Sequence, residues 1–252
     1  MNYGYWDKTI NNRNNALLKL NEVIAKKLKL TKKDYVLDAG CGFGEISLWL
    51  ASNINCKVEG ISIVSSQIKK AKMLAKKRGL NSMVNFKTID YTKTPYPDNH
   101  FDAIFAVETI CHLKDKAHFY KEMYRILKPS GRLLVTEYIL NKPQMSNAEK
   151  NEMKLMLNGW AIPNLWTKKQ HLKTMKNLGF SDISFENYSD KTIKTSLFLY
   201  RHSIYGLPIY RILHKVGLLS NIRLKNALSS KYQWITKQKG LWGHGLIFGK
   251  KP

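Results

Sequence analysis

The sequence has 252 residues, of which 44% are hydrophobic and 11% aromatic, so it can bury the core of one moderate domain and is not a disordered tail. Its 42 Lys and Arg against 18 Asp and Glu give a net charge of +24, which favours an anionic partner such as nucleic acid, an acidic membrane surface or a phosphorylated substrate. Three widely spaced cysteines without a C-x-x-C pair indicate neither a metal site nor a disulfide framework.

The positive charge is uneven along the chain. Residues 1–140 carry 23 Lys and Arg against 13 Asp and Glu, whereas residues 141–252 carry 19 against 5. The start of the chain has no apolar segment behind a basic stretch, and no run approaches the ~18 apolar residues of a membrane span. We therefore expect a cytoplasmic protein. The sequence leaves open whether the surplus charge is functional or the solvated helix faces of a lysine-rich proteome.

The first predicted elements lead to a glycine-rich turn. Aromatic residues at positions 3, 5 and 6 precede a helical pattern over 16–28, and an apolar strand then ends at Gly40, Gly42 and Gly44 before a helix over 45–51. Glycine permits positive φ and close approach of a ligand, and a helix N-terminus offers unpaired N–H groups. A nicotinamide-binding turn would have glycine in place of Glu45, so dinucleotide binding is the weaker interpretation.

Polar residues follow each of the next three predicted strands. The second strand, 57–63, contains Ser62 where many nucleotide-binding folds have a ribose-binding acid. The third strand, 84–89, is followed by Asp90 and Tyr91, and the fourth, 103–107, by Glu108. Because ligands of open α/β folds lie at the carboxyl ends of the strands, these residues are candidates for one site.

The remainder of the chain continues the alternation of helices and strands. The predicted segments are helix 65–78, helix 119–127, turn 128–131, strand 132–139, helix 153–157, helix 168–178, strand 183–186, helical stretch 192–238 and strand 240–248. This order predicts an α/β fold, a Rossmann-like seven-stranded mostly parallel sheet with helices on both faces. We expect one structural domain, with a core at 1–140, a helical cap with the sixth strand at 141–235 and the last strand at 236–252.

Several motifs resemble those of class I S-adenosylmethionine-dependent methyltransferases. Asp38-x-Gly40-x-Gly42-x-Gly44 resembles motif I of that class. Gly60-Ile61-Ser62-Ile63 with Gln67, and the start Tyr3-Gly4-Tyr5-Trp6, are similar to the sterol, tocopherol and terpenoid methyltransferase group. The turn at 127–132 and the ending at 240–245 also look like this group, so the resemblance covers nearly the whole chain.

The resemblance implies S-adenosylmethionine as the cofactor. The residues that it assigns to the cofactor are Asp38, Gly40, Gly42, Ser62, Gln67, Asp90, Tyr91 and Glu108. Asp38 would hold the amino-acid end, with helix capping as the alternative, and Asp90 would lie beside the adenine, with an ordinary turn as the alternative. No metal is implied.

The resemblance also implies where the methyl acceptor binds. In the sterol, tocopherol and terpenoid group a similar aromatic start folds over the cofactor pocket as a lid, although here it could instead only pack against the core. We expect Tyr3, Tyr5 and Trp160 to contact the substrate. Glu108 and His112 are the catalytic candidates, since a turn of helix would put them on one face and a hydroxyl or amine acceptor needs a base. An alkene acceptor would need aromatic faces and a carboxylate instead. His112 could also be purely structural.

Three functions remain under comparison. The favoured one is methyl transfer to a carbon atom of a largely apolar molecule that is sterol-, prenyl- or phenol-like, with or without an anionic head group. The alternative is an N- or O-methyltransferase of a small amine or natural product. A nucleic-acid methyltransferase would usually have Asn/Asp-Pro-Pro-Tyr where this chain has Glu108-Thr-Ile-Cys, so sequence-specific nucleic acid is not expected. A non-enzymatic binding protein on the same fold is the third. We expect peripheral contact with anionic membranes, and the oligomeric state stays open, a homodimer included.

Overall fold

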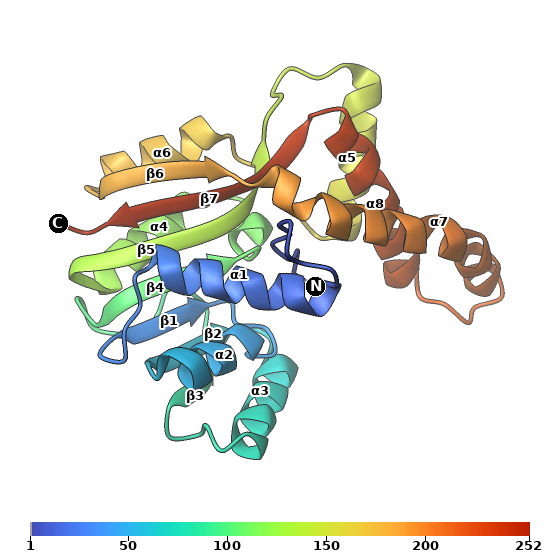
Figure 1. Cartoon of the computed structure of the whole chain (residues 1–252). Helices are drawn as coiled ribbons and strands as arrows, with labels where there is room; N and C mark the ends of the chain where they lie inside the picture. The colour runs from blue at the N-terminus through green and yellow to red at the C-terminus, as the bar shows by residue number, and fades with distance from the viewer. Residues whose placement is uncertain (1) are drawn as a thin grey trace.

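The computed structural model describes residues 2–252, in which seven strands form one sheet (Figure 1). The strand order is β3-β2-β1-β4-β5-β7-β6. Strands β1 to β5 are parallel, and β7 runs antiparallel to both β5 and β6. The strands are β1 (Tyr35–Ala39), β2 (Lys57–Ser62), β3 (Val84–Thr88), β4 (Phe101–Val107), β5 (Leu127–Leu140), β6 (Ser181–Asn187) and β7 (Trp242–Lys250). The predicted Rossmann-like sheet is confirmed.

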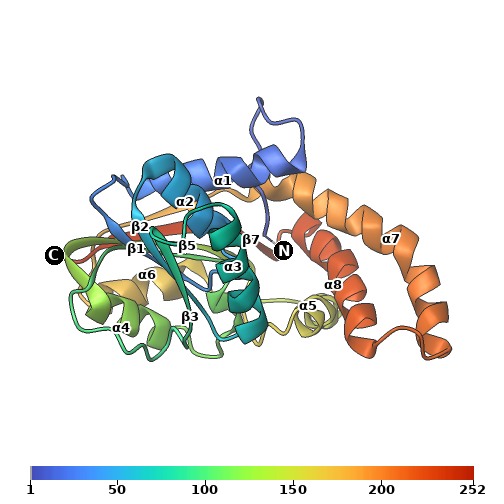
Figure 2. The same cartoon turned by 90° about the horizontal axis from the view of Figure 1, so that it is seen from below.

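Helices cover both faces of the sheet. Figure 2 shows α1 and α2 on one face and α4 and α6 on the other. The helices are α1 (Arg13–Lys27), α2 (Glu45–Ile54), α3 (Ser65–Lys77), α4 (Ala117–Ile126), α5 (Asn147–Gly159), α6 (Lys168–Asn177), α7 (Ile193–Lys215) and α8 (Asn221–Gln238), with short 3-10 helices η1 (Ile110–His112) and η2 (Ser189–Thr192). None of those within residues 2–252 is both long and apolar enough to cross a bilayer.

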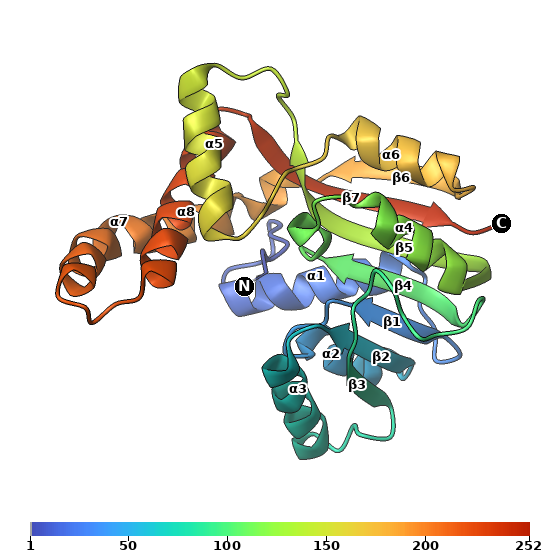
Figure 3. The same ribbon diagram turned by 180° about the vertical axis from the view of Figure 1, so that it is seen from behind.

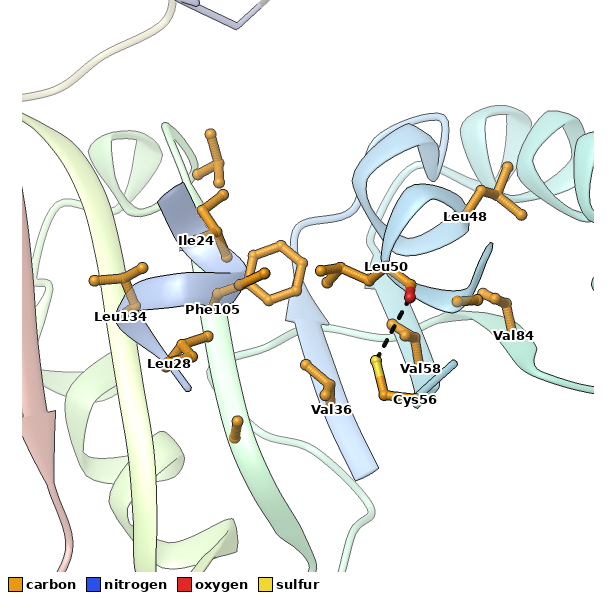
Figure 4. Packing of buried hydrophobic residues seen from close by; sticks show 14 of the residues in the cluster. Ile24, Leu28, Val36, Leu48, Leu50, Cys56, Val58, Val84, Phe105 and Leu134 are labelled. Atoms are coloured by element: carbon orange, nitrogen blue, oxygen red, sulfur yellow. Dashed lines mark hydrogen bonds between the residues drawn. The ribbon is translucent and has the colours of Figure 1, made fainter. Parts of the chain in front are cut away.

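The core on the α1–α2 face is built around the central strands. Figure 4 shows Ile24 of α1 and Leu50 of α2 lying near Phe105 of β4, all three fully buried. The opposite face is filled by a second cluster that includes Phe119 and Met123 of α4. Truncating a side chain such as Phe105 to alanine typically costs about 3–5 kcal/mol of stability, because a cavity is left behind. These two cores hold the carboxyl ends of β1 and β4 in a fixed position.

Helices α5, α7 and α8, which we call the α5–α7–α8 extension, lie beyond the sheet (Figure 3). A third cluster joins the extension to the strand ends, since Met153 and Met156 of α5 belong to it together with Tyr138 of β5 and Trp242 of β7. Helices α5 and α8 pack so closely that a Cβ on Gly159 would lie 2.1 Å from Ser229 Oγ. Helix α5 follows the carboxyl end of β5, α7 follows that of β6 by way of η2, and α8 leads into β7 at the same edge. The extension is therefore attached at the edge where the candidate site residues lie.

The region predicted as a cap, 141–235, divides between two places. Helix α6 packs on β6 and α4 as part of the sheet layers, whereas α5, α7 and α8 form the extension. The helical stretch predicted over 192–238 consists of α7 and α8, preceded by η2, and the prediction did not include the turn at residues 216–220, where Gly217 has φ +76°. Glycine adopts this left-handed conformation without the clash that a Cβ would cause. The segment is thus a helical hairpin.

Two further boundaries differ from the sequence prediction. Helix α5 begins at Asn147 rather than 153, because Ser146 and Glu149 form a reciprocal capping box that starts it earlier. The predicted turn 128–131 lies inside β5 as a bulge, since the pairing jumps from Phe101–Leu127 to Ala103–Arg132. Ser130 takes φ +64° there, so the bend is made without ending the strand.

Candidate functional site

The glycine turn after β1 lies at the centre of the candidate site. Gly40 has φ +99°, and a Cβ on it would lie 2.3 Å from Thr109 Oγ1, just beyond the end of β4. Gly42 has φ +54°, and a Cβ there would meet nothing within 4 Å. The absence of a side chain at Gly40 therefore allows the turn after β1 to pack against the loop after β4. At Gly42 it leaves space in which a ligand could approach the backbone.

Asp38 is a buried carboxylic acid at the end of β1. Its side chain is 3% exposed, and Ser47 Oγ of α2 donates a hydrogen bond of 2.6 Å to its Oδ2. Burial raises the pKa of Asp38 to about 7, because the protein interior disfavours the charged form. Asp38 does not cap helix α2, because the N-cap residue of α2 is Gly44, which makes no side-chain capping bond. A cationic ligand would remove the cost of burying this charge.

Ser62 and Gln67 lie together at the carboxyl end of β2. Ser62 Oγ donates to Gln67 Oε1 at 3.0 Å and accepts from the backbone N–H of Val64 at 3.2 Å. Between them in sequence, Ile63 is 66% exposed, which is unusual for an isoleucine that directly follows a buried strand. From the sequence, Ile63 is part of the predicted strand and of the motif at 60–63, with no contact of its own. Its exposure makes it a candidate for contact with a flat apolar ligand group.

Asp90 and Tyr91 follow β3. Asp90 is exposed, and its Oδ1 accepts hydrogen bonds from Thr92 N at 2.8 Å and Thr92 Oγ1 at 2.7 Å, the arrangement of a turn-forming aspartate. Tyr91 is buried, its ring packs edge-on against Phe119, and its hydroxyl donates to the backbone oxygen of Thr109 at 3.2 Å. Tyr91 thus supports the loop that contacts Gly40. Cofactor contact by either residue stays a prediction.

Glu108 is the most constrained residue of the site. It directly follows β4 with φ +48°, a conformation that costs a residue with a side chain about 1–2 kcal/mol. Its side chain is 4% exposed. Oε1 accepts from the backbone N–H of Tyr3 at 3.1 Å, and Oε2 accepts from the hydroxyl of Tyr138 at 3.0 Å. Burial raises the pKa of Glu108 to about 7, despite the hydrogen bond from Tyr3.

His112 does not join Glu108. The predicted helical turn is wrong, because Glu108 has a left-handed backbone and the 3-10 helix η1 starts two residues later at Ile110. The His112 ring is exposed, and its Nδ1 lies 3.3 Å from the backbone oxygen of Ala161. No hydrogen bond or ion pair links it to Glu108 within residues 2–252. Any assistance from His112 in catalysis stays a prediction.

A different histidine faces Glu108. His244 of β7 is fully buried, and its Nε2 lies 3.8 Å from Glu108 Oε1. Lys237 of α8 lies 3.3 Å from His244 Nδ1 through its Nζ and also donates to Thr192. With an ammonium group donating to Nδ1, the ring proton lies on Nε2, toward the carboxylate. Burial lowers the pKa of His244 well below its usual value and that of Lys237 to about 7.

Sequence reasoning missed His244 and Lys237. Both lie more than 120 residues from Glu108, so no local spacing connects them. The available signals were weak: His244 interrupts an apolar strand, and Lys237 is a lysine near the end of a helix. Glu137, also missed, is buried in β5 and accepts from the backbone N–H of Cys111 at 2.8 Å, so it fixes η1 beside Glu108.

One of the three predicted substrate residues, Tyr3, borders Glu108, and a second, Trp160, lies one ring farther. The Tyr3 hydroxyl donates to Gln233 of α8 at 2.8 Å, and its ring packs edge-on at 6.0 Å from that of Tyr138. Trp160 is half-buried and stacks on the other side of Tyr138, with ring centroids 6.1 Å apart. Tyr5 lies apart from them and stacks on Tyr188 at 6.0 Å. Glu108 is therefore a carboxylate among aromatic rings, and the N-terminal segment is packed into this group.

Comparison with known proteins identifies relatives of several kinds. A family model described as a methyltransferase domain matches residues 37–135, from β1 into β5. The 27-O-demethylrifamycin SV methyltransferase of Amycolatopsis mediterranei is 29% identical over 192 residues, 76% of this chain and 70% of that protein. The sterol 24-C-methyltransferase of Saccharomyces cerevisiae is 32% identical over 169 residues, 66% of this chain. The match spans only 44% of the yeast protein's length.

Solved structures share the fold over the whole chain. The [4+2]-cyclase SpnF has a TM-score of 0.82 and 24% identity, with coverage of 100% of this chain and 88% of that one. The geranyl diphosphate C-methyltransferase of Streptomyces coelicolor, solved with S-adenosyl-L-homocysteine, has a TM-score of 0.78 and 15% identity, also covering 100% and 88%. At these identities the likeness concerns the fold alone, and this fold is found with more than one reaction.

Proposed function

The chain belongs to the class I S-adenosylmethionine-dependent methyltransferases, and on that premise we propose that it methylates a carbon atom of a largely apolar small molecule. The proposal includes acceptors of the sterol, prenyl or phenol kind, with or without an anionic head group. The observation that carries it is the buried carboxylate of Glu108, which lies among the rings of Tyr3, Tyr138 and, one ring farther, Trp160. Aromatic faces and a carboxylate are what a cationic carbon intermediate requires.

The residues after β1 and β2 fit the amino-acid and sugar parts of the cofactor. S-adenosylmethionine supplies an electrophilic methyl group on a sulfonium. The buried carboxylate of Asp38 has one hydrogen-bond donor, Ser47, and would gain a cationic partner in the ammonium group of the cofactor. Gly42 leaves the backbone open to approach, and Ser62 with Gln67 offers hydroxyl and amide groups for a ribose. The residues present therefore fit the cofactor.

Glu108 serves the acceptor in this proposal. As a carboxylate with its pKa raised to about 7, it can take a proton from the acceptor near neutral pH or oppose the positive charge that develops on it. Tyr138 and the backbone of Tyr3 hold the two oxygens in fixed directions, which keeps the carboxylate positioned for the reaction. His244, through Nε2, is the third group directed toward the same carboxylate.

Methyl transfer to oxygen or nitrogen of a small amine or natural product is the second candidate. The relative from Amycolatopsis supports it, because that protein is named as a methyltransferase of 27-O-demethylrifamycin SV and 70% of it is covered. Glu108 suits this chemistry equally well, since a hydroxyl or ammonium acceptor has to lose a proton. A nucleic-acid acceptor is less favoured, because the extension contributes apolar and aromatic side chains to this site.

An apolar acceptor partitions into lipid, so peripheral contact of the protein with an anionic membrane surface belongs to this proposal.

Cofactor binding and the identity of the methylated atom are tested separately. Isothermal titration with S-adenosyl-L-homocysteine should give binding that a nicotinamide dinucleotide does not reproduce. Methyl-labelled cofactor would then be offered with prenyl diphosphates, sterols, phenols and small amines, and the labelled atom located by NMR. Label on carbon supports the first candidate, label on oxygen or nitrogen the second, and no binding of the cofactor would overturn both.

A further inference from the structure

The far end of the helical hairpin projects from the body of the protein. We call residues 204–222, which include the end of α7 and the start of α8, the α7–α8 tip. Between Leu207 and Ala227 no residue is buried, and Figure 1 shows this part of the hairpin extending away from the sheet. The tip therefore makes little use of its side chains in the core of its own chain.

The tip nevertheless carries a row of exposed apolar side chains. Tyr205, Ile209, Ile212 and Val216 are spaced by four, three and four residues, so they form one stripe along α7. Their exposed fractions are 78%, 58%, 63% and 61%. The buried residue Ser203 lies opposite Tyr205 on the helix and the buried Leu207 lies opposite Ile209, since each pair is two residues apart and two residues correspond to about 200°. The stripe therefore faces away from the core.

The end of the hairpin adds to this apolar surface. Leu218, in the turn, and Ile222, in the first turn of α8, are 75% and 71% exposed. Half of the large apolar side chains that are exposed in residues 2–252 fall within the tip. Monomeric soluble proteins rarely expose contiguous apolar patches beyond a few hundred Å², and larger ones usually mark interaction surfaces. The exposed apolar surface of the tip is therefore a candidate interaction surface.

The charge of the hairpin identifies the chemistry of that partner. No Asp or Glu occurs after Asp190, so α7 and α8 carry only positive charges. Arg211 and Lys215 are exposed and one turn apart on α7, roughly 90–130° around the helix from the apolar stripe, and Arg223 and Lys225 follow at the start of α8. Two such surfaces from two copies of the chain would repel each other, which disfavours a homodimer through the tip. A stripe of isoleucines is equally unsuited to nucleic acid, whose surface is phosphate and sugar.

We propose that the α7–α8 tip is a peripheral docking surface for bilayers that contain anionic phospholipid. The apolar stripe enters the headgroup and acyl boundary, and the neighbouring cations pair with lipid phosphates. This proposal rests on the proposed function, in which the acceptor is apolar and dissolves in the lipid bilayer. The hairpin is part of the extension that borders Glu108. Docking of the tip would therefore bring the acceptor half of the site close to the bilayer.

The test uses flotation of the full chain with vesicles, in the absence of acceptor. One vesicle type contains phosphatidylglycerol and phosphatidylcholine in equal parts, and the other phosphatidylcholine alone. Two double variants address the tip, Arg211→Gln with Lys215→Gln and Ile209→Asn with Ile212→Asn. The matched control is Lys72→Gln with Lys76→Gln, two exposed lysines with the same spacing on α3, and Met73→Asn is the apolar control there.

The wild type should float with the anionic vesicles and should not bind the neutral vesicles. The charge variant should lower the partition coefficient roughly 30-fold, and the isoleucine variant roughly tenfold or more. Both α3 controls should bind like the wild type. Equal binding to the two vesicle types, equal loss in the α3 controls, or self-association through the tip without vesicle binding would each overturn the proposal. Titration with S-adenosyl-L-homocysteine on the same preparations separates this failure from that of the proposed function, since cofactor binding does not involve the tip.

Discussion

The two halves of the candidate site differ in how they are built. In the half next to β1, β2 and β3, each polar side chain is held by a neighbour in sequence: Ser47 is nine residues from Asp38, Gln67 is five from Ser62, and Thr92 is two from Asp90. In the half around Glu108, the partners are remote. Tyr3 lies 105 residues away, and Gln233 lies 230 residues from Tyr3. The first half is a set of local turns, and the second exists only in the folded chain.

This difference implies a division of labour that mutations can test. Local turns at three strand ends suit a cofactor shared by a whole class of enzymes. The remote group, which takes residues from the N-terminus, β4, β5, α8 and β7, can change with any of these segments and so suits an acceptor that differs between relatives. If the division holds, changes in one half alter turnover and changes in the other alter cofactor affinity.

The largest effect is expected for Glu108→Gln. Glutamine keeps the shape, can accept from the Tyr3 N–H through its amide oxygen and can donate to the Tyr138 hydroxyl through its amide nitrogen, but it neither takes a proton nor carries the negative charge. Turnover should fall about 10² to 10⁴-fold, with the cofactor dissociation constant changed no more than about threefold. Rates come from transfer of labelled methyl groups and affinities from titration calorimetry. A variant with full turnover, or one that loses cofactor binding together with rate, would remove Glu108 from the acceptor half.

The reciprocal experiment is Asp38→Asn. Asparagine still accepts the hydrogen bond from Ser47, so the turn should remain folded, but the charge that would meet the ammonium group is lost. We expect the cofactor dissociation constant to rise roughly 10- to 100-fold, as for the loss of a charged hydrogen bond. Turnover at saturating cofactor should fall far less. Unchanged affinity would mean that the amino-acid end of the cofactor lies elsewhere.

A third experiment sharpens the picture of the acceptor half through pH. Glu108 acts in its deprotonated form, so the rate should rise with pH around its pKa of about 7. Lys237 is one of the groups that favour the carboxylate, so Lys237→Gln should raise the pKa of Glu108 further and move the rate profile to higher pH by roughly one unit. At pH 7 this corresponds to a loss of about fivefold in rate, because the deprotonated fraction falls from about one half to about one eleventh.

The control for that experiment is Lys239→Gln, two positions away. Lys239 pairs with Glu152 at the surface and is remote from the buried cluster. Its variant should keep the wild-type pH profile. A parallel shift in both variants would point to the overall charge of the protein rather than to the Lys237 ammonium beside His244.

The same contrast explains what the sequence could predict. The succession of strands along the chain, the glycine turn and the candidates Asp38, Ser62 and Gln67 follow from hydrophobic periodicity and local motifs, which fix backbone shape over a few residues. The group around Glu108 does not, because His244 and Lys237 reach it through the antiparallel strand β7 and the packing of α8. The hairpin break at Gly217 was missed because α7 and α8 share one continuous helical composition, and only a single glycine marks the turn.

The smallest effect is expected for His112→Ala, and it bears on the comparison because sequence spacing and structure disagree about this residue. Four residues separate His112 from Glu108, which in a helix would put both on one face. The left-handed backbone at Glu108 breaks that relation, and within residues 2–252 the exposed His112 ring has one hydrogen-bonding contact, with the backbone oxygen of Ala161. Removing one exposed hydrogen bond should leave turnover within about threefold of the wild type and the pH profile unshifted.

His244→Gln is the informative counterpart, since it removes the ring whose Nε2 faces Glu108 at 3.8 Å. If His112→Ala instead lost more turnover than His244→Gln, the acceptor would approach Glu108 from the side of η1, and the local spacing would have identified the working histidine after all.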